Sequence, residues 1–122
     1  MKGSHIDAGR IGEEIAECYL LLAGYRIIDR NYRAGRLEID IIVQRRDCLV
    51  FAEVKTRRSS GFGSALENLL PAKIAKIREA AVSYISENCR AVKPENFRID
   101  LIAIDMEAER GRMTLNHIEG VT

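Results

Sequence analysis

Three polar side chains interrupt two apolar segments of the chain, and their spacing would allow them to act together on a cation. Asp40 lies within LEIDIIVQ, and Glu53 and Lys55 lie two residues apart in CLVFAEVK. If these segments pair as a hairpin that turns at Arg46 and Asp47, Asp40 is opposite Glu53, and directly opposed residues share one face of a sheet. Two carboxylates so close repel each other, so we expect a divalent cation to offset their charge. Oxygen ligands with open coordination positions favour Mg²⁺ or Mn²⁺.

The same register pairs Ile42 with Phe51 and Glu38 with Lys55. It leaves one face of the hairpin wholly apolar, formed by Leu37, Ile39, Ile41, Val43, Val50, Ala52 and Val54. A slip of one residue would move charged side chains into that face, so the apolar pattern supports the register independently of any function. The alternative is that an acid and a lysine alternating on a strand form only a solvated edge with a weak ion pair.

The elements that would position these residues follow from the periodicity of the chain. A helix is predicted between a cap at Asp7 and a stop at Gly24, and a second helix after Pro71. Strands are predicted at 25–32, 37–44, 48–55, 96–105 and 112–118, and a short capped helix between Ser64 and Pro71. The order αβββαββ indicates an α/β protein with a mixed five-stranded sheet flanked by helices.

Each helix has an apolar stripe that predicts how it packs. In the first helix the stripe is Ile11, Ile15, Cys18, Tyr19 and Leu22, and a second face of Gly9, Gly12, Ala16 and Leu20 would allow close approach of another element. In the second helix the stripe is Ile74, Ile77, Ala81, Tyr84 and Ile85.

Length and composition limit the class of protein. A chain of 122 residues, 47% hydrophobic and 30% charged, is expected to form a single domain over 1–122 with its own core. No signal peptide or membrane-spanning run is apparent. The three cysteines form no CxxC pair, which argues against zinc and disulfides and favours a cytoplasmic location. A net charge of +1 means that any case for nucleic-acid binding depends on local clustering.

The motifs EID and EVK, preceded by a helix that carries a glutamate, resemble the core of the PD-(D/E)xK nuclease superfamily, which includes restriction-endonuclease-like and Holliday-junction-resolvase-like enzymes. The chain is more closely similar to the uncharacterised bacterial YraN-like family. The likeness runs through GRIGEEIAECYLLLAGYRIIDRNYR, EIDIIV, VFAEVKTR, Lys73 and FRIDLIAI. It implies a restriction-endonuclease-like core and a magnesium- or manganese-dependent endonuclease that hydrolyses DNA, branched or otherwise structured.

The resemblance also implies roles for individual residues. Asp40, Glu53 and the backbone carbonyl of Val54 would hold the metal. Lys55 would orient or help to deprotonate the attacking water and stabilise developing charge. Glu13 would be an outer acid contacting metal-bound water, although the helical wheel leaves Glu14 as an alternative. Glu38 would contact the residues that hold the metal without binding the metal itself, or would simply pair with Lys55.

Basic residues flank these motifs and are expected to contact phosphate groups. They are Arg33, Arg36, Arg57, Arg58 and Lys73. Cleavage of two strands needs two sites, which favours a homodimer. The alternative is a non-catalytic nucleic-acid-binding or accessory module that retains the fold. Asp100 is expected to be structural, paired with Arg98 or a helix end, and His117 to lie on the surface without a partner.

Overall fold

A computed structural model describes residues 7–58, 71–88 and 96–121. Its elements are α1 (Ala8–Leu22), β1 (Arg26–Ala34), β2 (Leu37–Arg45), β3 (Cys48–Arg57), α3 (Pro71–Glu87), β4 (Asn96–Glu107), a 3₁₀ turn η1 (Ala108–Arg110) and β5 (Arg112–Ile118). The predicted order αβββαββ is therefore confirmed for the described part of the chain. The short helix predicted between Ser64 and Pro71 lies outside it. No helix within these ranges is long and apolar enough to cross a membrane.

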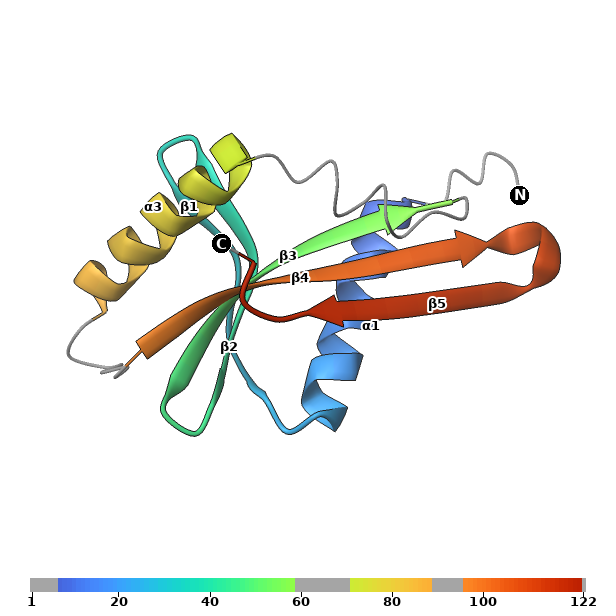
Figure 1. The fold of residues 1–122 in the computed structure, drawn as a ribbon, viewed down its shortest axis with the longest axis horizontal. Coiled ribbons are helices and arrows are strands. Elements are labelled where there is room, and N and C mark those ends of the chain that lie inside the picture. The colour runs from blue at the N-terminus through green and yellow to red at the C-terminus, as the bar shows by residue number, and fades with distance from the viewer. Residues whose placement is uncertain (1–6, 59–70, 89–95, 122) are drawn as a thin grey trace.

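The five strands form one mixed sheet in the order β1-β2-β3-β4-β5 (Figure 1). Neighbouring strands are antiparallel except β3 and β4, which are parallel and joined through α3. A parallel pair needs such a crossover, because the chain must return to the same end of the sheet. This arrangement confirms the mixed five-stranded sheet flanked by helices.

The sheet separates two apolar clusters, one under each helix. On the α3 side, Ile77, Ala80, Ala81 and Tyr84 pack on a cluster that includes Ile42, Leu49, Phe51, Ile99 and Leu101. On the α1 side, Ala16 and Leu20 pack on Ile41, Val43, Val50, Ala52 and Ile102. The apolar stripe predicted for α3 is thus the buried one, since Ile74 and Ile85 also pack against the first cluster.

The β2–β3 hairpin has the predicted register only over its first half. Arg45 pairs with Cys48 around a two-residue turn, Ile42 pairs with Phe51, and the last pair is Ile41 with Ala52. The predicted pairing of Asp40 with Glu53, and of Glu38 with Lys55, is wrong: β2 remains paired with β1 down to Leu37, while β3 continues beside β4. Figure 1 shows β2 and β3 diverging from this point. We call the region where they separate, between Asp40 on β2 and Glu53–Lys55 on β3, the fork.

Because of this divergence, the side chains at the start of β2 point to the opposite side of the sheet from the one predicted. Ile39 lies in the α3-side cluster and Leu37 packs against it, whereas Ile41 lies in the α1-side cluster. The prediction that Leu37 and Ile39 share a face with Ile41 is therefore wrong. The alternation is interrupted at Asp40, because β2 twists away from β3 there.

Helix α1 packs on the sheet mainly through the second face predicted for it, and Ile15 and Tyr19 of the predicted apolar stripe pack beside this face as partly buried residues. Gly12, Ala16 and Leu20 are its buried residues, and Leu22 of the predicted stripe is 90% exposed. A Cβ added at Gly12 would lie 1.9 Å from Thr56 Oγ1, a hydroxyl that is itself buried. Gly12 therefore allows α1 to pack directly on β3, next to the fork.

A buried polar network fixes the other end of α1 to the sheet. Asp100 accepts hydrogen bonds from both the Nε and the Nη2 of Arg98, at 2.8 and 2.9 Å. His117 bonds to Asp100 through Nε2 and to Tyr19 of α1 through Nδ1, both at 2.7 Å. Arg98 is thus the partner predicted for Asp100. The prediction for His117 is wrong, because pairing of β5 with β4 brings it beside Ile102, on the buried α1 side.

Substituting Gly12 by Ala tests the close packing of α1 on β3. The added methyl group must displace α1 or the Thr56 side chain, so we expect a loss of about 1–3 kcal/mol in the free energy of unfolding. The matched control is Gly9→Ala, whose Cβ would meet only Asp7 Oδ1 at an ordinary 3.5 Å. It should be neutral or stabilising by about 0.4–1 kcal/mol. Equal effects in urea unfolding would contradict this account of the packing.

Substituting Asp100 by Asn tests the network. Burial alone would raise the pKa of Asp100, but hydrogen bonds from His117, Arg98 and the Gly120 amide lower it below its usual range. Its charged form therefore adds stability above the unfolded-state pKa, and this contribution is lost as pH falls toward the folded-state pKa. Asp100→Asn should cost about 1.5–3 kcal/mol at pH 7 because it removes the charged acceptor of Arg98, which keeps its contacts with Tyr25 and Glu119.

The difference in stability between wild type and Asp100→Asn should shrink as urea unfolding is repeated at progressively lower pH. Asp47→Asn, a change of an exposed acid in the β2–β3 turn, is the control and should leave the pH profile unchanged. A constant difference between wild type and Asp100→Asn down to pH 3 would show that the charge of Asp100 does not stabilise the fold.

Candidate functional site

Where the backbone hydrogen bonds between β2 and β3 end, a side chain of β2 bonds to the backbone of β3. Asp40 Oδ2 accepts a hydrogen bond of 2.8 Å from the backbone amide of Val54. The carboxylate thus takes the place of the backbone acceptor that β2 no longer supplies. In an extended strand the N–H and C=O of one residue point to the same side, so the Val54 carbonyl also faces the fork. The carboxylate of Asp40 and the carbonyl predicted as a metal ligand therefore lie together.

Glu53 is the central buried acid of the site. Its side chain is 7% exposed, and its Oε2 lies 3.7 Å from Lys55 Nζ on the same strand and 3.8 Å from Lys73 Nζ on α3. Lys55 is thus positioned beside the acid, as the motif predicts. Lys73, predicted to bind nucleic acid on the rim, instead lies on the carboxylate itself.

The charge of Asp40 acts on the ionisation of Glu53. Burial raises the pKa of Glu53, and the charge of Asp40 raises it further, while Lys73 and Lys55 oppose the increase. Burial also raises the pKa of Asp40, where the Val54 amide, Lys73 and Lys55 oppose it. Glu53 directly precedes Val54, whose amide bonds to Asp40, so both acids lie beside the same short stretch of β3.

The structure distinguishes the two acids of α1. Glu13 has a raised pKa, caused first by burial and then by the charges of Asp40 and Glu38, so its carboxyl lies near the fork. Glu14 is exposed and pairs with Arg10 at 3.5 Å, one turn earlier on α1. Of the two acids, Glu13 is thus the partly buried one and Glu14 the exposed one. Glu13 is partly buried because it directly follows Gly12, which lies on the face of α1 that packs against the sheet.

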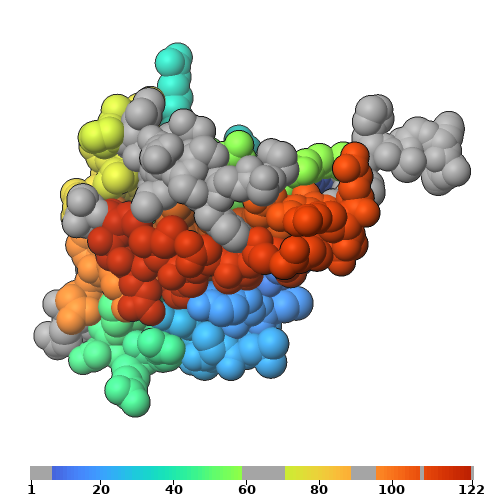
Figure 2. All heavy atoms as spheres, turned by 45° about the vertical axis from the view of Figure 1, so that its right-hand side comes forward, coloured from blue at the N-terminus to red at the C-terminus, as the bar shows by residue number. Residues whose placement is uncertain are grey.

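The predicted phosphate-binding residues are spread along the edges of the fork. Glu38 pairs with Arg33 at 3.6 Å, and within the described ranges it makes no ion pair with Lys55. Arg36 is exposed in the turn between β1 and β2, and the tip of this hairpin, in turquoise in Figure 2, projects from the surface. Arg57 is half-buried and Arg58 exposed at the end of β3, beyond Lys55.

The donor set at the fork fits a hard divalent cation. Asp40 and Glu53 offer carboxylate oxygens and Val54 a carbonyl, which are the ligands that Mg²⁺ and Mn²⁺ prefer. Burial makes the charged forms of both acids costly, so a bound cation would relieve that cost. Within residues 7–58, 71–88 and 96–121, no three histidine, cysteine or acidic side chains gather tightly enough to form a metal-binding group on their own. Water and substrate would have to supply the remaining ligands.

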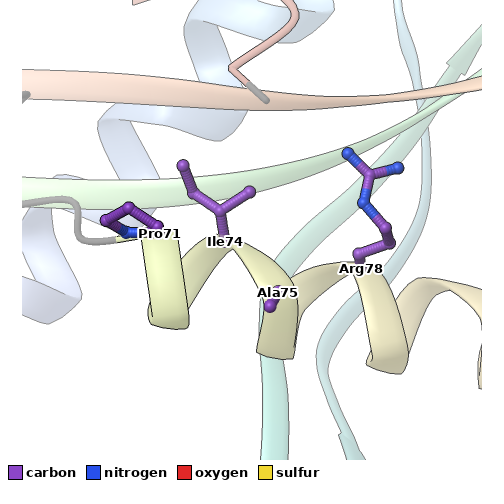
Figure 3. Close-up of a pocket in the computed structure, with 4 residues that line it drawn as sticks. All are labelled: Pro71, Ile74, Ala75 and Arg78. Atoms are coloured by element: carbon purple, nitrogen blue, oxygen red, sulfur yellow. The ribbon is translucent and has the colours of Figure 1, made fainter.

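A pocket of about 420 Å³ lies along α3 and is lined by Pro71, Ile74, Ala75 and Arg78. Figure 3 shows the side chains of Ile74 and Arg78 pointing from α3 toward the strands. Among the described residues, those that line this pocket include no acid of the fork and offer no carboxylate or nucleophile. We therefore assign the candidate site to the fork, where the polar groups converge.

Comparison with known proteins places the chain in a family. The model of the uncharacterised protein family UPF0102 matches residues 12–104. A UPF0102 protein of Kineococcus radiotolerans is 40% identical over 114 residues, covering 93% of this chain and 92% of the relative. A UPF0102 protein of Oleidesulfovibrio alaskensis is 48% identical over 105 residues, covering 86% of this chain but only 51% of the relative.

Among solved structures, SfsA of Pyrococcus furiosus in complex with Ca²⁺ matches over 94% of this chain and 64% of its own length, with 19% identity and a TM-score of 0.37. That likeness is distant. The family match instead extends over the fork, from Gly12 beside Glu13 to the strand that pairs with β3. The chain belongs to the UPF0102 family.

Proposed function

We propose that this protein is a metal-dependent nuclease that hydrolyses phosphodiester bonds in DNA, with a restriction-endonuclease-like core and its active site at the fork. The observation that carries the proposal is that Glu53 lies 3.7 and 3.8 Å from the ammonium groups of Lys55 and Lys73, while Asp40 on the diverging strand β2 bonds to the residue after Glu53. Buried acids held close to each other and to lysines are uncommon as structural features, because the charged groups are costly to desolvate. Such arrangements are typical of functional sites.

The fork residues divide the work of hydrolysis among them. Asp40, Glu53 and the Val54 carbonyl would hold Mg²⁺ or Mn²⁺, which when bound acts as a Lewis acid on the phosphate and activates water. Lys55 places a positive charge where negative charge develops on the phosphate oxygens. Glu13, with its raised pKa, would accept a hydrogen bond or a proton from water approaching the fork from the α1 side.

Substrate recognition would depend on the edges of the fork. Arg36 on the projecting hairpin and Arg33, Arg57 and Arg58 beside the strands would contact phosphate groups of the backbone, which position a nucleic acid without reading its sequence. Such contacts suit a branched or structured DNA, whose shape rather than sequence would be recognised. Cleavage of two strands would use two copies of the chain, and we propose that the protein acts as a homodimer in the cytoplasm.

Cleavage of labelled branched and linear DNA in the presence of Mn²⁺ tests the proposal. Glu53→Gln removes a ligand charge, and Lys55→Met removes a positioned cation; each should lower the cleavage rate by about 10²–10³-fold. Glu13→Gln should have a smaller effect. Glu14→Gln, a change of its exposed neighbour on α1, is the matched control and should leave the rate unchanged.

Two outcomes would contradict the proposal. Cleavage that persists undiminished in Glu53→Gln and Lys55→Met would come from a contaminating nuclease. DNA binding without cleavage by the wild type, whether or not Mn²⁺ is present, would instead favour an accessory module that retains the nuclease fold.

Arg36 gives a separate test of DNA binding. If its guanidinium neutralises one phosphate, Arg36→Ala should weaken binding and reduce the slope of log K against log salt concentration by about 1. Arg26→Ala is the control: Arg26 bonds to Gln44 at 2.9 Å, at the end of β1 away from the hairpin tip. An unchanged slope in fluorescence anisotropy titrations of Arg36→Ala would remove the hairpin tip from the binding surface.

A further inference from the structure

Two lysines approach the same oxygen of one buried acid from different elements. Glu53 Oε2 lies 3.7 Å from Lys55 Nζ and 3.8 Å from Lys73 Nζ. Both separations are longer than a hydrogen bond, so the pairs are held by charge rather than by directed bonds. The positive charges of the two lysines match the negative charges of Asp40 and Glu53. Asp40 and Glu53 thus have counter-charges within the protein itself when no metal is bound, while Glu38 adds negative charge nearby.

The two lysines differ in how they are held. Lys55 follows Glu53 by two residues on β3, a central strand, and on the same face of the sheet. Lys73 is the third residue of α3, and it reaches the acid across the space between helix and sheet with a side chain that is 44% exposed. The two ammonium groups lie at nearly equal distances from Glu53 Oε2, although only Lys55 is on the same strand as the acid. Lys73 is therefore the ammonium group that can leave the acid without disturbing β3.

A divalent cation bound by Asp40 and Glu53 would be close to this ammonium group and would repel it. Lysine has four methylene groups and a compact charge, so it can turn away without any movement of the backbone. A lysine released in this way remains next to the bound metal, at the position where a phosphate of the substrate would enter. Its preferred new partner is an anion.

We propose that Lys73 is an internal counter-ion that occupies the fork in the metal-free protein, and that metal binding displaces it from Glu53 toward a phosphate group of the substrate. This inference rests on the proposed function and deepens it. Lys73 would compete with the metal and cooperate with the substrate. Metal and nucleic acid would then strengthen each other's binding, because the metal releases the cation that the phosphate requires.

Isothermal titration with Mn²⁺, without any nucleic acid, tests the competition. Lys73→Met keeps the length and apolar character of the stem but removes the charge, and it should bind Mn²⁺ about tenfold more tightly than the wild type. Lys73→Ala should change the affinity in the same direction, which separates the effect of charge from any effect of packing. Lys76→Met, a change of an exposed lysine one turn further along α3, is the matched control and should leave the Mn²⁺ affinity unchanged.

The second half of the test measures DNA binding in the slow-cleaving Lys55→Met background by fluorescence anisotropy. Addition of Mn²⁺ should strengthen DNA binding, and Lys73→Met should remove most of that gain. If the wild type binds Mn²⁺ but Lys73→Met binds it equally or more weakly, the counter-ion role is wrong and the nuclease proposal stands. If the wild type binds no Mn²⁺, the nuclease proposal fails and the counter-ion role fails with it.

Discussion

The hydrogen bond from the Val54 amide to the Asp40 carboxylate is the interaction on which the candidate site depends. Strands β2 and β3 stop pairing after Ile41 and Ala52, which would leave backbone donors of a central strand without acceptors. A buried amide without a partner is costly, so the position strongly favours a side-chain acceptor. Asp40 meets that requirement with one oxygen at 2.8 Å. The strand separation that opens the site and the acid that would bind a metal are thus consequences of one local constraint.

The carboxylates of Asp100 and of the fork differ in the direction of their pKa shifts. Asp100 receives hydrogen bonds from Arg98, His117 and the Gly120 amide, and its pKa is lowered. At the fork, Asp40 and Glu53 have raised pKa values, because burial and neighbouring acids outweigh the nearby lysines. The first group stabilises the fold in its charged form. The second group reduces stability at neutral pH, and this is the usual compromise at a site that must accept a cation.

Much of the fold was predictable from local patterns, and the rest was not, for physical reasons. Alternating apolar residues and turn signals identified all five strands and the hairpin at Arg46. The same alternation assigned Leu37 and Ile39 to the wrong face of the sheet. Their face is decided by where β2 separates from β3 while staying paired with β1, and an alternation of apolar and polar residues does not reveal such a change in strand direction. The helical pattern of α1 offered two faces, and the buried one is the face of Gly12, Ala16 and Leu20. The pattern alone could not decide between them, because the space beside Thr56 that requires a glycine at position 12 depends on where β3 lies.

The candidate site was predictable to the extent that its residues lie within one motif. Asp40, Glu53 and Lys55 follow from the two motifs and the family resemblance, whereas the predicted pairing of Asp40 with Glu53 across the hairpin is wrong, because β2 and β3 stop pairing after Ile41 and Ala52. The contact of Lys73 with Glu53 depends on where α3 crosses the sheet, and no local pattern carries that information. The same is true of His117, whose partners Tyr19 and Asp100 become neighbours only when the whole sheet has formed.

The bond between Tyr19 and His117 joins residues that are 98 positions apart in the chain. Helix α1 is made early during synthesis on the ribosome, and β5 is the last of the described strands to be made. The helix therefore cannot gain this anchor until nearly all of the described chain has been translated. Since the same helix carries Glu13, the fork would reach its final arrangement only after β5 has been translated.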